Sequence, residues 1–461
     1  MFSSVIIDAK LIARYGGNGP RYTSYPTADR FVEAFDEQAY RHWLRLRPVS
    51  GHSRPFSLYV HLPFCGTVCY YCACNKIITR DRGRAKAYLA NLAKEIALVC
   101  AQIGAERQVE QIHLGGGTPT FLSDAELREL KDLIAANFKL NPKGEYAIEV
   151  DPRSVDPGRV ALLAELGFNR ISLGVQDFDP VVQRAVNRIQ SVAETLAVAQ
   201  AARTHGFRSI NFDLIYGLPR QTIEGFDRTL DLVCAAAPDR IALYSYAHLP
   251  TVFMPQRRIA AADLPTPEVK LRLFTLAIEK FTASGYIYIG MDHFAKPEDD
   301  LAVAQRQGRL TRNFQGYSSG GETDIVGLGV SAIGSVGPAY SQNHKDLDRY
   351  TGCLDADELP VMRGIQASAD DLARRAVIQS LACHCRVSKE SISIAHLIDF
   401  DTYFVAELKA LQVLRDDGLV ELDDEWISVT PVGRLLVRAV CMVFDRYLRE
   451  GLERAQYSRV L

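Results

Sequence analysis

Six short β-rich runs alternate with stretches of helical spacing, and this alternation constrains the fold more than any other feature of the chain. The runs are Ser57–Leu62, Val109–Leu114, Tyr146–Val150, Arg170–Leu173, Ile210–Ile215 and Ile241–Tyr244. Between the first two, Tyr88, Leu92 and Ile96 recur at a spacing that places them on one face of a helix. Short apolar runs separated by helices are typical of a parallel sheet. Six of them in succession favour an open or closed βα barrel over a doubly wound sheet.

The segments on either side of this region lack the alternation. Arg21–Phe31 (RYTSYPTADRF) is rich in Tyr, Thr and Pro and predicts an extended arm with a short helix after it. In the C-terminal region, helical stretches at 369–383 and 400–417 lead to a hairpin at 418–430 and a final helix from Pro431, an order that resembles a winged helix. The hairpin tip is acidic and would repel the phosphate backbone of DNA, so we favour a cap or docking domain over a DNA-binding domain.

We therefore predict an α/β protein with a partial (β/α)6-type barrel, an N-terminal arm, and a mostly helical, winged-helix-like C-terminal domain. The expected bounds are 1–50 for the arm and its short helix, 51–349 for the barrel with its extensions, and 350–461 for the C-terminal domain. A further apolar run at Tyr286–Ile289 predicts another strand.

Charge and hydropathy exclude several classes of protein. A formal net charge of −2 over 461 residues provides no field for nucleic acid or an anionic membrane surface. No apolar run is long enough to span a bilayer, and the first residues lack the apolar core of a secretory signal. We expect a cytoplasmic protein that acts without nucleic acid or membrane, and we expect no disulfides among its ten cysteines.

Four of the ten cysteines crowd into the segment that directly follows the first predicted strand. Cys65, Cys69 and Cys72 have the spacing C-x3-C-x2-C, and three thiolates in one short loop suit a soft metal centre. A cubane 4Fe–4S cluster held by three cysteines leaves one iron open. An open iron can bind the amino and carboxylate groups of S-adenosylmethionine. The spacing therefore predicts an iron–sulfur site that generates a 5′-deoxyadenosyl radical.

A structural zinc site with Cys74 as the fourth ligand is the competing interpretation. Zinc sites usually pair two short ligand turns that are separated along the chain, whereas Cys72 and Cys74 are only two residues apart. Cys74 can equally be a functional thiol, a residue that supports the ligands, or part of the packing, and its role stays open.

Polar residues recur where successive predicted strands end. They are Gly115-Gly116-Gly117-Thr118, Glu149, Asp151, Gln176, Asp177, Asp213 and Ala247-His248. The carboxyl ends of barrel strands meet at one edge, where catalytic residues gather. Glycines let the backbone approach a ligand closely. Glu149 and Asp213 could meet ribose hydroxyls or an amino group, and Arg188 could meet a carboxylate.

Nine motifs together resemble those of the oxygen-independent coproporphyrinogen III oxidases. They read GPRYTSYPTADRF, YVHLPFC-x3-CYYCACNK, IHLGGGTPTFL, IEVDPR, RISLGVQDF, NFDLIYGLP, YSYAHLP, MDHFAKPEDDLAVAQ and RNFQGYS. The resemblance covers nearly the whole chain, to the closing YSRVL. It implies a radical S-adenosylmethionine oxidoreductase of porphyrin and haem biosynthesis that converts two propionates of coproporphyrinogen III to vinyl groups, giving protoporphyrinogen IX. It also implies two S-adenosylmethionine molecules and an electron acceptor. We expect a flavodoxin-like or ferredoxin-like electron donor, and a monomer.

The resemblance also implies roles for individual residues. The matching cluster ligands are Cys65, Cys69 and Cys72. The matching cofactor contacts are Tyr59, Tyr71, Gly116, Gly117, Thr118, Glu149, Gln176, Arg188, Asp213, Ala247 and Ile333, with Gln315 as a further contact. The candidate catalytic residues are Cys74 and Tyr59. Arg21, Lys10 and Arg312 are candidate partners of the substrate's propionates. Ile189 departs from the family pattern, in which an acidic residue is common at this position.

Two other functions stay open. A haem chaperone of the same superfamily would share the barrel and the three-cysteine motif but would transfer haem; Cys74 and the RYTSYPTA arm favour the oxidase. A cluster-bearing electron-transfer or sensing protein would need neither an open iron nor a polar rim on a barrel.

Overall fold

The computed structural model describes residues 9–47, 55–105, 107–449, 457 and 460. Its contacts group the chain into two compact units, each built from separate segments. Unit 1 comprises Met1–Arg30, Thr275–Gly321 and Ala367–Leu461, and unit 2 comprises Phe31–Phe274 and Glu322–Gln366. The three-part division expected from the sequence stays a prediction, and its boundary at 50/51 lies outside the described residues.

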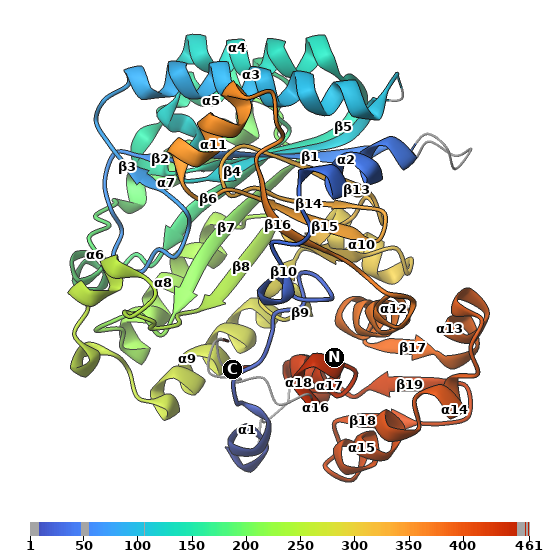
Figure 1. Ribbon diagram of the computed structural model, residues 1–461. Coiled ribbons are helices and arrows are strands. Elements are labelled where there is room, and N and C mark those ends of the chain that lie inside the picture. The colour runs from blue at the N-terminus through green and yellow to red at the C-terminus, as the bar shows by residue number, and fades with distance from the viewer. Residues whose placement is uncertain (1–8, 48–54, 106, 450–456, 458–459, 461) are drawn as a thin grey trace. The chain divides into compact units, whose positions relative to one another are not determined.

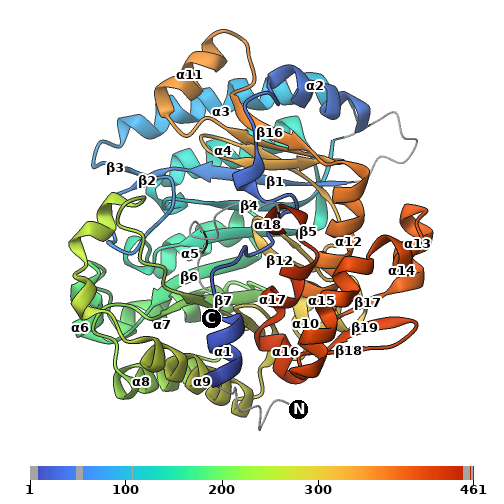
Figure 2. The same cartoon turned by 60° about the horizontal axis from the view of Figure 1, so that its bottom comes forward.

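Unit 2 contains the predicted parallel sheet. Its six central strands are β1 (Phe56–Leu62), β4 (Gln108–Gly116), β5 (Lys139–Val150), β6 (Arg170–Gln176), β7 (Ser209–Tyr216) and β8 (Arg240–Ser245). They lie in this order, and each is parallel to the next (Figure 1). Figure 2 shows the same succession from β1 to β7. Each predicted run therefore became one strand of a βα barrel, which confirms the predicted fold class.

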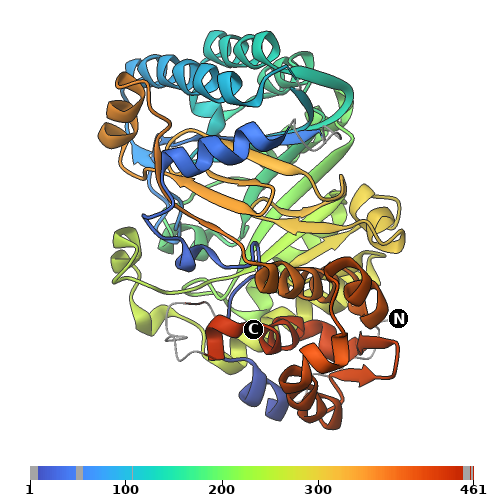
Figure 3. The ribbon, with the colours of Figure 1, turned by 45° about the vertical axis from the view of Figure 1, so that its right-hand side comes forward.

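The sheet continues on the far side of β1. β13 (Asp324–Leu328) is parallel to β1, and β14 (Ile333–Val336), β15 (Ala339–Asn343) and β16 (Val361–Gln366) follow as antiparallel strands. These late strands are drawn in yellow-orange and orange in Figure 3. The sequence analysis did not predict this extension.

Helices connect the parallel strands. They include α3 (Gly83–Ile103), α4 (Asp124–Asn137), α5 (Pro157–Glu165), α6 (Pro180–Ala185), α7 (Val192–Thr204) and α8 (Ile223–Ala236). Tyr88, Leu92 and Ile96 are buried on α3, as their spacing predicted. The hydroxyl of Ser123 accepts from the backbone N–H of Glu126, whose carboxylate reaches back to close a capping box at α4. Among the described residues, no helix combines the length and apolar character needed to cross a membrane.

Unit 1 contains the predicted C-terminal fold. α12 (Ala369–His384) precedes a three-stranded antiparallel sheet of order β17 (Arg386–Ser388), β19 (Trp426–Val429), β18 (Val420–Leu422), with α13 (Lys389–His396) and α15 (Val405–Asp416) between β17 and β18. The helix predicted at 400–417 is split into α14 (Phe400–Tyr403) and α15, and the final helix into α16 (Pro431–Leu435) and α17 (Val437–Val443). The breaks fall at Phe404 and Leu436, both fully buried, so packing overrides helical periodicity there.

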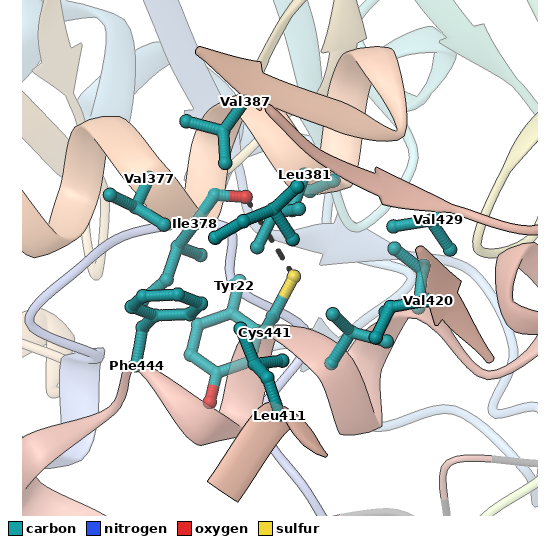
Figure 4. Packing of buried hydrophobic residues seen from close by; sticks show 14 of the residues in the cluster. Tyr22, Val377, Ile378, Leu381, Val387, Leu411, Val420, Val429, Cys441 and Phe444 are labelled. Atoms are coloured by element: carbon teal, nitrogen blue, oxygen red, sulfur yellow. Dashed lines mark hydrogen bonds between the residues drawn. The ribbon is translucent and has the colours of Figure 1, made fainter. Parts of the chain in front are cut away.

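Unit 1 also contains a further predicted strand and the N-terminal arm. The strand predicted at Tyr286–Ile289 is confirmed as β9 (Ile287–Gly290), which forms an antiparallel pair with β10 (His293–Ala295). The extended arm places Tyr22 and Tyr25 in the apolar core of the C-terminal helices. Figure 4 shows Tyr22 beside Ile378, Leu411, Cys441 and Phe444. The Tyr22 hydroxyl donates to the Asp445 carboxylate at 3.0 Å, so the arm is an integral part of unit 1.

Candidate functional site

The three-cysteine loop is closed by a short strand pair in unit 2. β2 (Phe64–Cys65) runs parallel to β3 (Ile77–Ile78), and the loop between them carries Cys69, Cys72 and Cys74. Two backbone hydrogen bonds join its ends, from Ile77 N–H to the Pro63 carbonyl at 2.7 Å and from Thr79 N–H to the Cys65 carbonyl at 3.0 Å. The loop therefore returns to its starting point at the C-terminal end of β1.

The glycine run at the end of β4 packs directly against the root of this loop. The N–H groups of Gly117 and Thr118 donate to the carbonyls of Leu62 and Phe64, each at 2.8 Å. A Cβ on Gly117 would lie 2.6 Å from the Pro63 carbonyl oxygen. A Cβ on Gly116, whose φ is +112°, would lie 2.7 Å from the His61 ring. Close packing of two strand ends is therefore sufficient reason for these glycines, whether or not they also contact a cofactor.

The thiols of the loop lie among hydrogen-bond donors. Thr118 Oγ1 donates to Cys65 Sγ at 3.5 Å, and Arg188 Nη1 and Arg153 Nη2 approach Cys69 Sγ at 3.6 and 3.7 Å. A hydrogen bond from the Cys74 thiol lowers the pKa of Cys72 to about 6. Burial raises the pKa of Cys65 to about 11. Positive charge and donors at sulfur favour thiolates, the form in which cysteine binds metal.

The arrangement fits a cluster better than a single ion. Within the described residues, no group of three or more His, Cys, Asp or Glu side chains converges on a position for one metal ion. Structural zinc sites usually pair two ligand turns that are separated along the chain, whereas three cysteines of one short loop can ligate three corners of a cubane. The donor set of the loop consists of thiols, which suits a soft metal centre such as a 4Fe–4S cluster.

Arg188 is held in place by a carboxylate at the end of β5. Its Nη1 and Nη2 each approach the Asp151 carboxylate at 3.3 Å, and Nη2 also donates to the Gly174 carbonyl at 2.6 Å. A Cβ on Gly174 would lie 2.9 Å from both Arg188 Nη2 and Gln176 Nε2, so glycine makes room for both side chains. Burial raises the pKa of Asp151, but the guanidinium groups of Arg188 and Arg153 outweigh burial and hold this pKa below its usual value. The buried Nε of Arg188 has no hydrogen-bond partner.

Two carboxylates, on β5 and β7 with β6 between them, lie at this edge of the sheet, and their pKa values shift in opposite directions. The Glu149 carboxylate accepts from His113 Nε2 at 3.0 Å and from Gly116 N–H at 3.3 Å, and these contacts outweigh burial and lower its pKa. Burial raises the pKa of Asp213 to about 6, although Ser172 and Asn211 each donate to it at 2.8 Å. Glu149 is therefore a fixed negative charge that can accept from an amino group or ribose hydroxyls.

The Tyr59 hydroxyl belongs to a polar chain that the sequence analysis missed. His61 Nε2 lies 2.9 Å from the Asn75 carbonyl, which only accepts, so Nε2 carries the proton. His61 Nδ1 then accepts from the Tyr59 hydroxyl at 3.1 Å. Burial lowers the pKa of His61, so the ring is neutral. The Tyr59 ring also stacks on His113 with centroids 5.8 Å apart, which links it to Glu149.

A buried glutamine, also missed, ties the cysteine loop to the end of β8. Gln256 is 1% exposed and lies in the 3-10 helix Met254–Arg258. Its Nε2 donates to the carbonyls of Tyr71 and Ala247, each at 3.2 Å, and its Oε1 accepts from Leu249 N–H at 2.6 Å. Tyr71 lies between two of the cysteines, so one amide joins two segments that carry predicted cofactor contacts. No spacing in the sequence indicates this role of Gln256. The contact of Arg153 with Cys69 was also missed, although the motif IEVDPR, which contains Arg153, could have indicated it.

The remaining predicted contacts fall in both units. Ile333 begins β14, and its carbonyl would lie 2.6 Å from a Cβ on Gly327, so β14 packs tightly on β13 in unit 2. Gln315 belongs to unit 1, in the turn between β11 (Thr311–Asn313) and β12 (Gly316–Ser318). There, the Arg312 guanidinium lies 4.7 Å from the Tyr317 ring centroid and its Nε donates to the Arg21 carbonyl at 3.1 Å. Unit 2 therefore contains all the predicted cluster ligands and cofactor contacts except Gln315, whereas the candidate propionate partners Lys10, Arg21 and Arg312 belong to unit 1.

Comparison with known proteins identifies the class to which this site belongs. Residues 59–233 match the model of the Radical SAM superfamily. Together with the parallel βα sheet and the three-cysteine loop at its edge, this match makes the chain a radical S-adenosylmethionine protein, the class for which a 4Fe–4S cluster and S-adenosylmethionine are the implied cofactors.

Full-length relatives define the family. The chain is 52% identical over 463 residues to the oxygen-independent coproporphyrinogen III oxidase of Pseudomonas aeruginosa, with 100% of both chains covered. It is 49% identical over 454 residues to the enzyme of that name from Escherichia coli, with 98% of each covered. A solved structure of coproporphyrinogen III oxidase from Escherichia coli, described as a radical SAM enzyme, matches with a TM-score of 0.91 and 48% identity over 96% of this chain and 99% of that chain. The chain belongs to the family of oxygen-independent coproporphyrinogen III oxidases.

Proposed function

We propose that this protein converts coproporphyrinogen III to protoporphyrinogen IX without oxygen, using a 4Fe–4S cluster held by Cys65, Cys69 and Cys72. The observation that carries the proposal is the three-thiol loop, tied by hydrogen bonds to the carboxyl edge of a parallel βα sheet. The names of the full-length relatives supply the substrate. The haem chaperone and the electron-transfer protein, weighed as alternatives on the sequence, are not favoured, because these relatives are named as oxidases.

The overall reaction defines what the site must hold. Each of two propionates loses a β-hydrogen, carbon dioxide and one electron, which leaves a vinyl group. The cluster, when bound, supplies the electron that cleaves S-adenosylmethionine and so provides the 5′-deoxyadenosyl radical that removes the hydrogen. The chain's own residues must therefore keep three thiolates available, orient the sulfonium cofactor and exclude water.

Several side chains are suited to these tasks. Arg188 and Arg153 lie at the Cys69 sulfur, where both can donate hydrogen bonds to it and fix its position. Glu149 is ionised and can accept hydrogen bonds from the cofactor's amino group or ribose, and Asp213 lies two strands further along the sheet, on β7. We assign the remaining cofactor contacts to the predicted set of Tyr59, Tyr71, Gly116, Gly117, Thr118, Gln176, Ala247, Ile333 and Gln315.

Finer features of the proposal follow from the family resemblance. Two S-adenosylmethionine molecules would bind, and Cys74 and Tyr59 are the candidate catalytic residues. Cys74 is exposed and its thiol hydrogen-bonds to Cys72, so it lies at the cluster loop without being needed as a ligand. A flavodoxin-like or ferredoxin-like donor, a separate electron acceptor and a monomeric enzyme complete the proposal.

Anaerobic turnover tests the proposal directly. The reconstituted protein is incubated with coproporphyrinogen III, S-adenosylmethionine and dithionite together with an electron acceptor, and the products are separated by chromatography. We expect protoporphyrinogen IX and 5′-deoxyadenosine, with the Cys69→Ala variant as the inactive control. Haem binding without any conversion of coproporphyrinogen would instead favour the chaperone.

A further inference from the structure

The outer side of the cysteine loop is flanked by two segments that contact it directly. Asn187, after α6, donates from Nδ2 to the Val68 carbonyl at 2.7 Å, and Tyr70 N–H donates to the Val186 carbonyl at 2.9 Å. On the other flank, Arg258 Nη1 donates to the Tyr70 hydroxyl at 3.2 Å, and its guanidinium lies 5.3 Å from the centroid of the same ring. Residues 65–78, 181–190 and 252–260 thus share a surface, and we call their exposed side chains the loop face.

The loop face is unusually apolar for an exposed surface. Twelve large apolar side chains are exposed in the described parts of the chain, and five of them belong to these three short segments. They are Ile78, Val181, Ile189, Val252 and Met254. Ile189 and Met254 are 69% and 68% exposed, so they do not contribute to the core of the unit. Clustered exposed apolar side chains, unlike isolated ones, indicate a contact surface.

The charge of the loop face has one sign. Residues 65–78, 181–190 and 252–260 contain no Asp or Glu, although the whole chain has a net charge of −2. Arg184, Arg257 and Arg258 are exposed on it. The flanking carboxylates of Asp179 and Asp263 are engaged by other arginines, at 3.6 Å from Arg228 and 3.3 Å from Arg220. Ile189 stands where the family resemblance leads one to expect an acid, which removes a negative charge from this face.

We propose that the loop face is the docking surface for an acidic one-electron carrier protein that reduces the cluster. This inference rests on the proposed function. Electron transfer slows steeply with distance. Val68 and Tyr70 belong to the same loop as Cys69 and Cys72, so a carrier bound at this face is separated from the cluster only by residues of the loop itself. Small interfaces are typical of electron-transfer encounters, and a positive face steers an acidic partner into register.

The electron balance is simple. The carrier is oxidised by one electron and the cluster is reduced by one, and no bond forms or breaks between the two proteins. Reductive cleavage of the cofactor's carbon–sulfur bond consumes this electron. The electron that each propionate later releases goes to the separate acceptor, so one docking event is needed for each vinyl group formed.

Charge reversal tests the inference. The Arg184→Glu/Arg258→Glu double variant is compared with Lys143→Glu, an exposed cation near the start of β5 and therefore at the opposite edge of the sheet. The reduced carrier is an acidic flavodoxin, and the readouts are the rate of cluster reduction in the holoenzyme, followed by electron paramagnetic resonance, and the Kd from calorimetry. We expect the double variant to lose at least about tenfold in rate and affinity at low salt, with the deficit shrinking as salt is added, and the control to be unchanged.

Turnover with dithionite separates the two proposals. Dithionite needs no docking surface, so the double variant should turn over like the unmodified enzyme with it; if it does not, the milder Arg184→Gln/Arg258→Gln variant takes its place in the comparison. Unchanged reduction by flavodoxin in a variant that is active with dithionite would overturn the docking inference alone. So would an unmodified cluster that acidic flavodoxin fails to reduce at any salt concentration. Absence of product with dithionite in the unmodified protein would instead overturn the proposed function.

Discussion

Replacing Gln256 by methionine should weaken both the fold of unit 2 and its cofactor site. Methionine has a similar volume but no donor or acceptor of comparable strength, so the carbonyls of Tyr71 and Ala247 and the N–H of Leu249 would lose their partner. An unsatisfied buried polar group costs about 1–3 kcal/mol. Because partial entry of water relieves some of this cost, we expect the free energy of unfolding to fall by about 2–4 kcal/mol.

Equilibrium unfolding in urea under anaerobic conditions, followed by circular dichroism, measures this loss. The matched control is Gln200→Met on α7, where the glutamine is exposed and the change should stay within about 0.5 kcal/mol. Since Tyr71 lies between Cys69 and Cys72, the variant should also show a raised KM for S-adenosylmethionine and a weaker spectral response of the cluster to it. A loss of stability no larger than that of the control would refute the idea that this amide holds the two segments together.

Three further predictions concern the loop and a buried acid. Cys69→Ala should abolish cluster assembly, seen as loss of iron and of the visible absorption, while circular dichroism shows a folded chain; retained iron at the unmodified level would contradict the ligand assignment. Gly117→Ala should cost about 1–3 kcal/mol in unfolding free energy and reduce the iron content, because its Cβ would meet the carbonyls of Pro63 and Phe64 at 2.6 and 2.8 Å. Burial raises the pKa of Glu95 to about 7 despite hydrogen bonds from Tyr350, Asn343 and the Gly329 N–H. The native state therefore holds this proton more tightly than the unfolded chain, so stability should fall by about 3 kcal/mol as the pH rises from 4.5 to 7. Glu95→Gln should show a flatter profile in urea titrations over that range, and an unchanged slope would show that the acid is not protonated in the native state.

The six parallel strands could be predicted because each leaves a short β-rich run in the sequence whose apolar side chains are buried, such as Ile171 and Leu173 on β6. Their lengths were less predictable: β5 begins at Lys139, and its first half carries polar residues that mask the signal. The extension from β13 to β16 was missed because its strands are short and follow one another with antiparallel pairing, without the helices of the βα rhythm. The helices predicted as continuous are interrupted where Phe404 and Leu436 turn into the core, which periodicity does not report.

For the site, features that depend on neighbouring residues could be predicted from the sequence, whereas contacts between distant segments could not. The spacing of Cys65, Cys69 and Cys72 already indicated the kind of metal centre, because three thiols in one short loop are brought together by the loop itself. The capping box at Ser123 likewise depends only on near neighbours, because Ser123 and Glu126 are three residues apart. By contrast, His61 and Gln256 carry no recognisable signal in the sequence, and their roles depend on atoms contributed by other segments.

The sequence alone thus determined the features whose cause lies within a few residues: strand runs, helix starts, and a three-thiol loop placed just after the first strand. The tertiary structure decided what depends on contacts between distant segments. It showed that Gly117 is needed because it touches Pro63 more than fifty residues earlier, and that Tyr22 of the arm belongs to the core of the C-terminal helices. The physical reason is that hydrogen bonding within a loop or a helix turn acts over short distances along the chain, whereas packing and burial are settled only when segments remote in sequence meet.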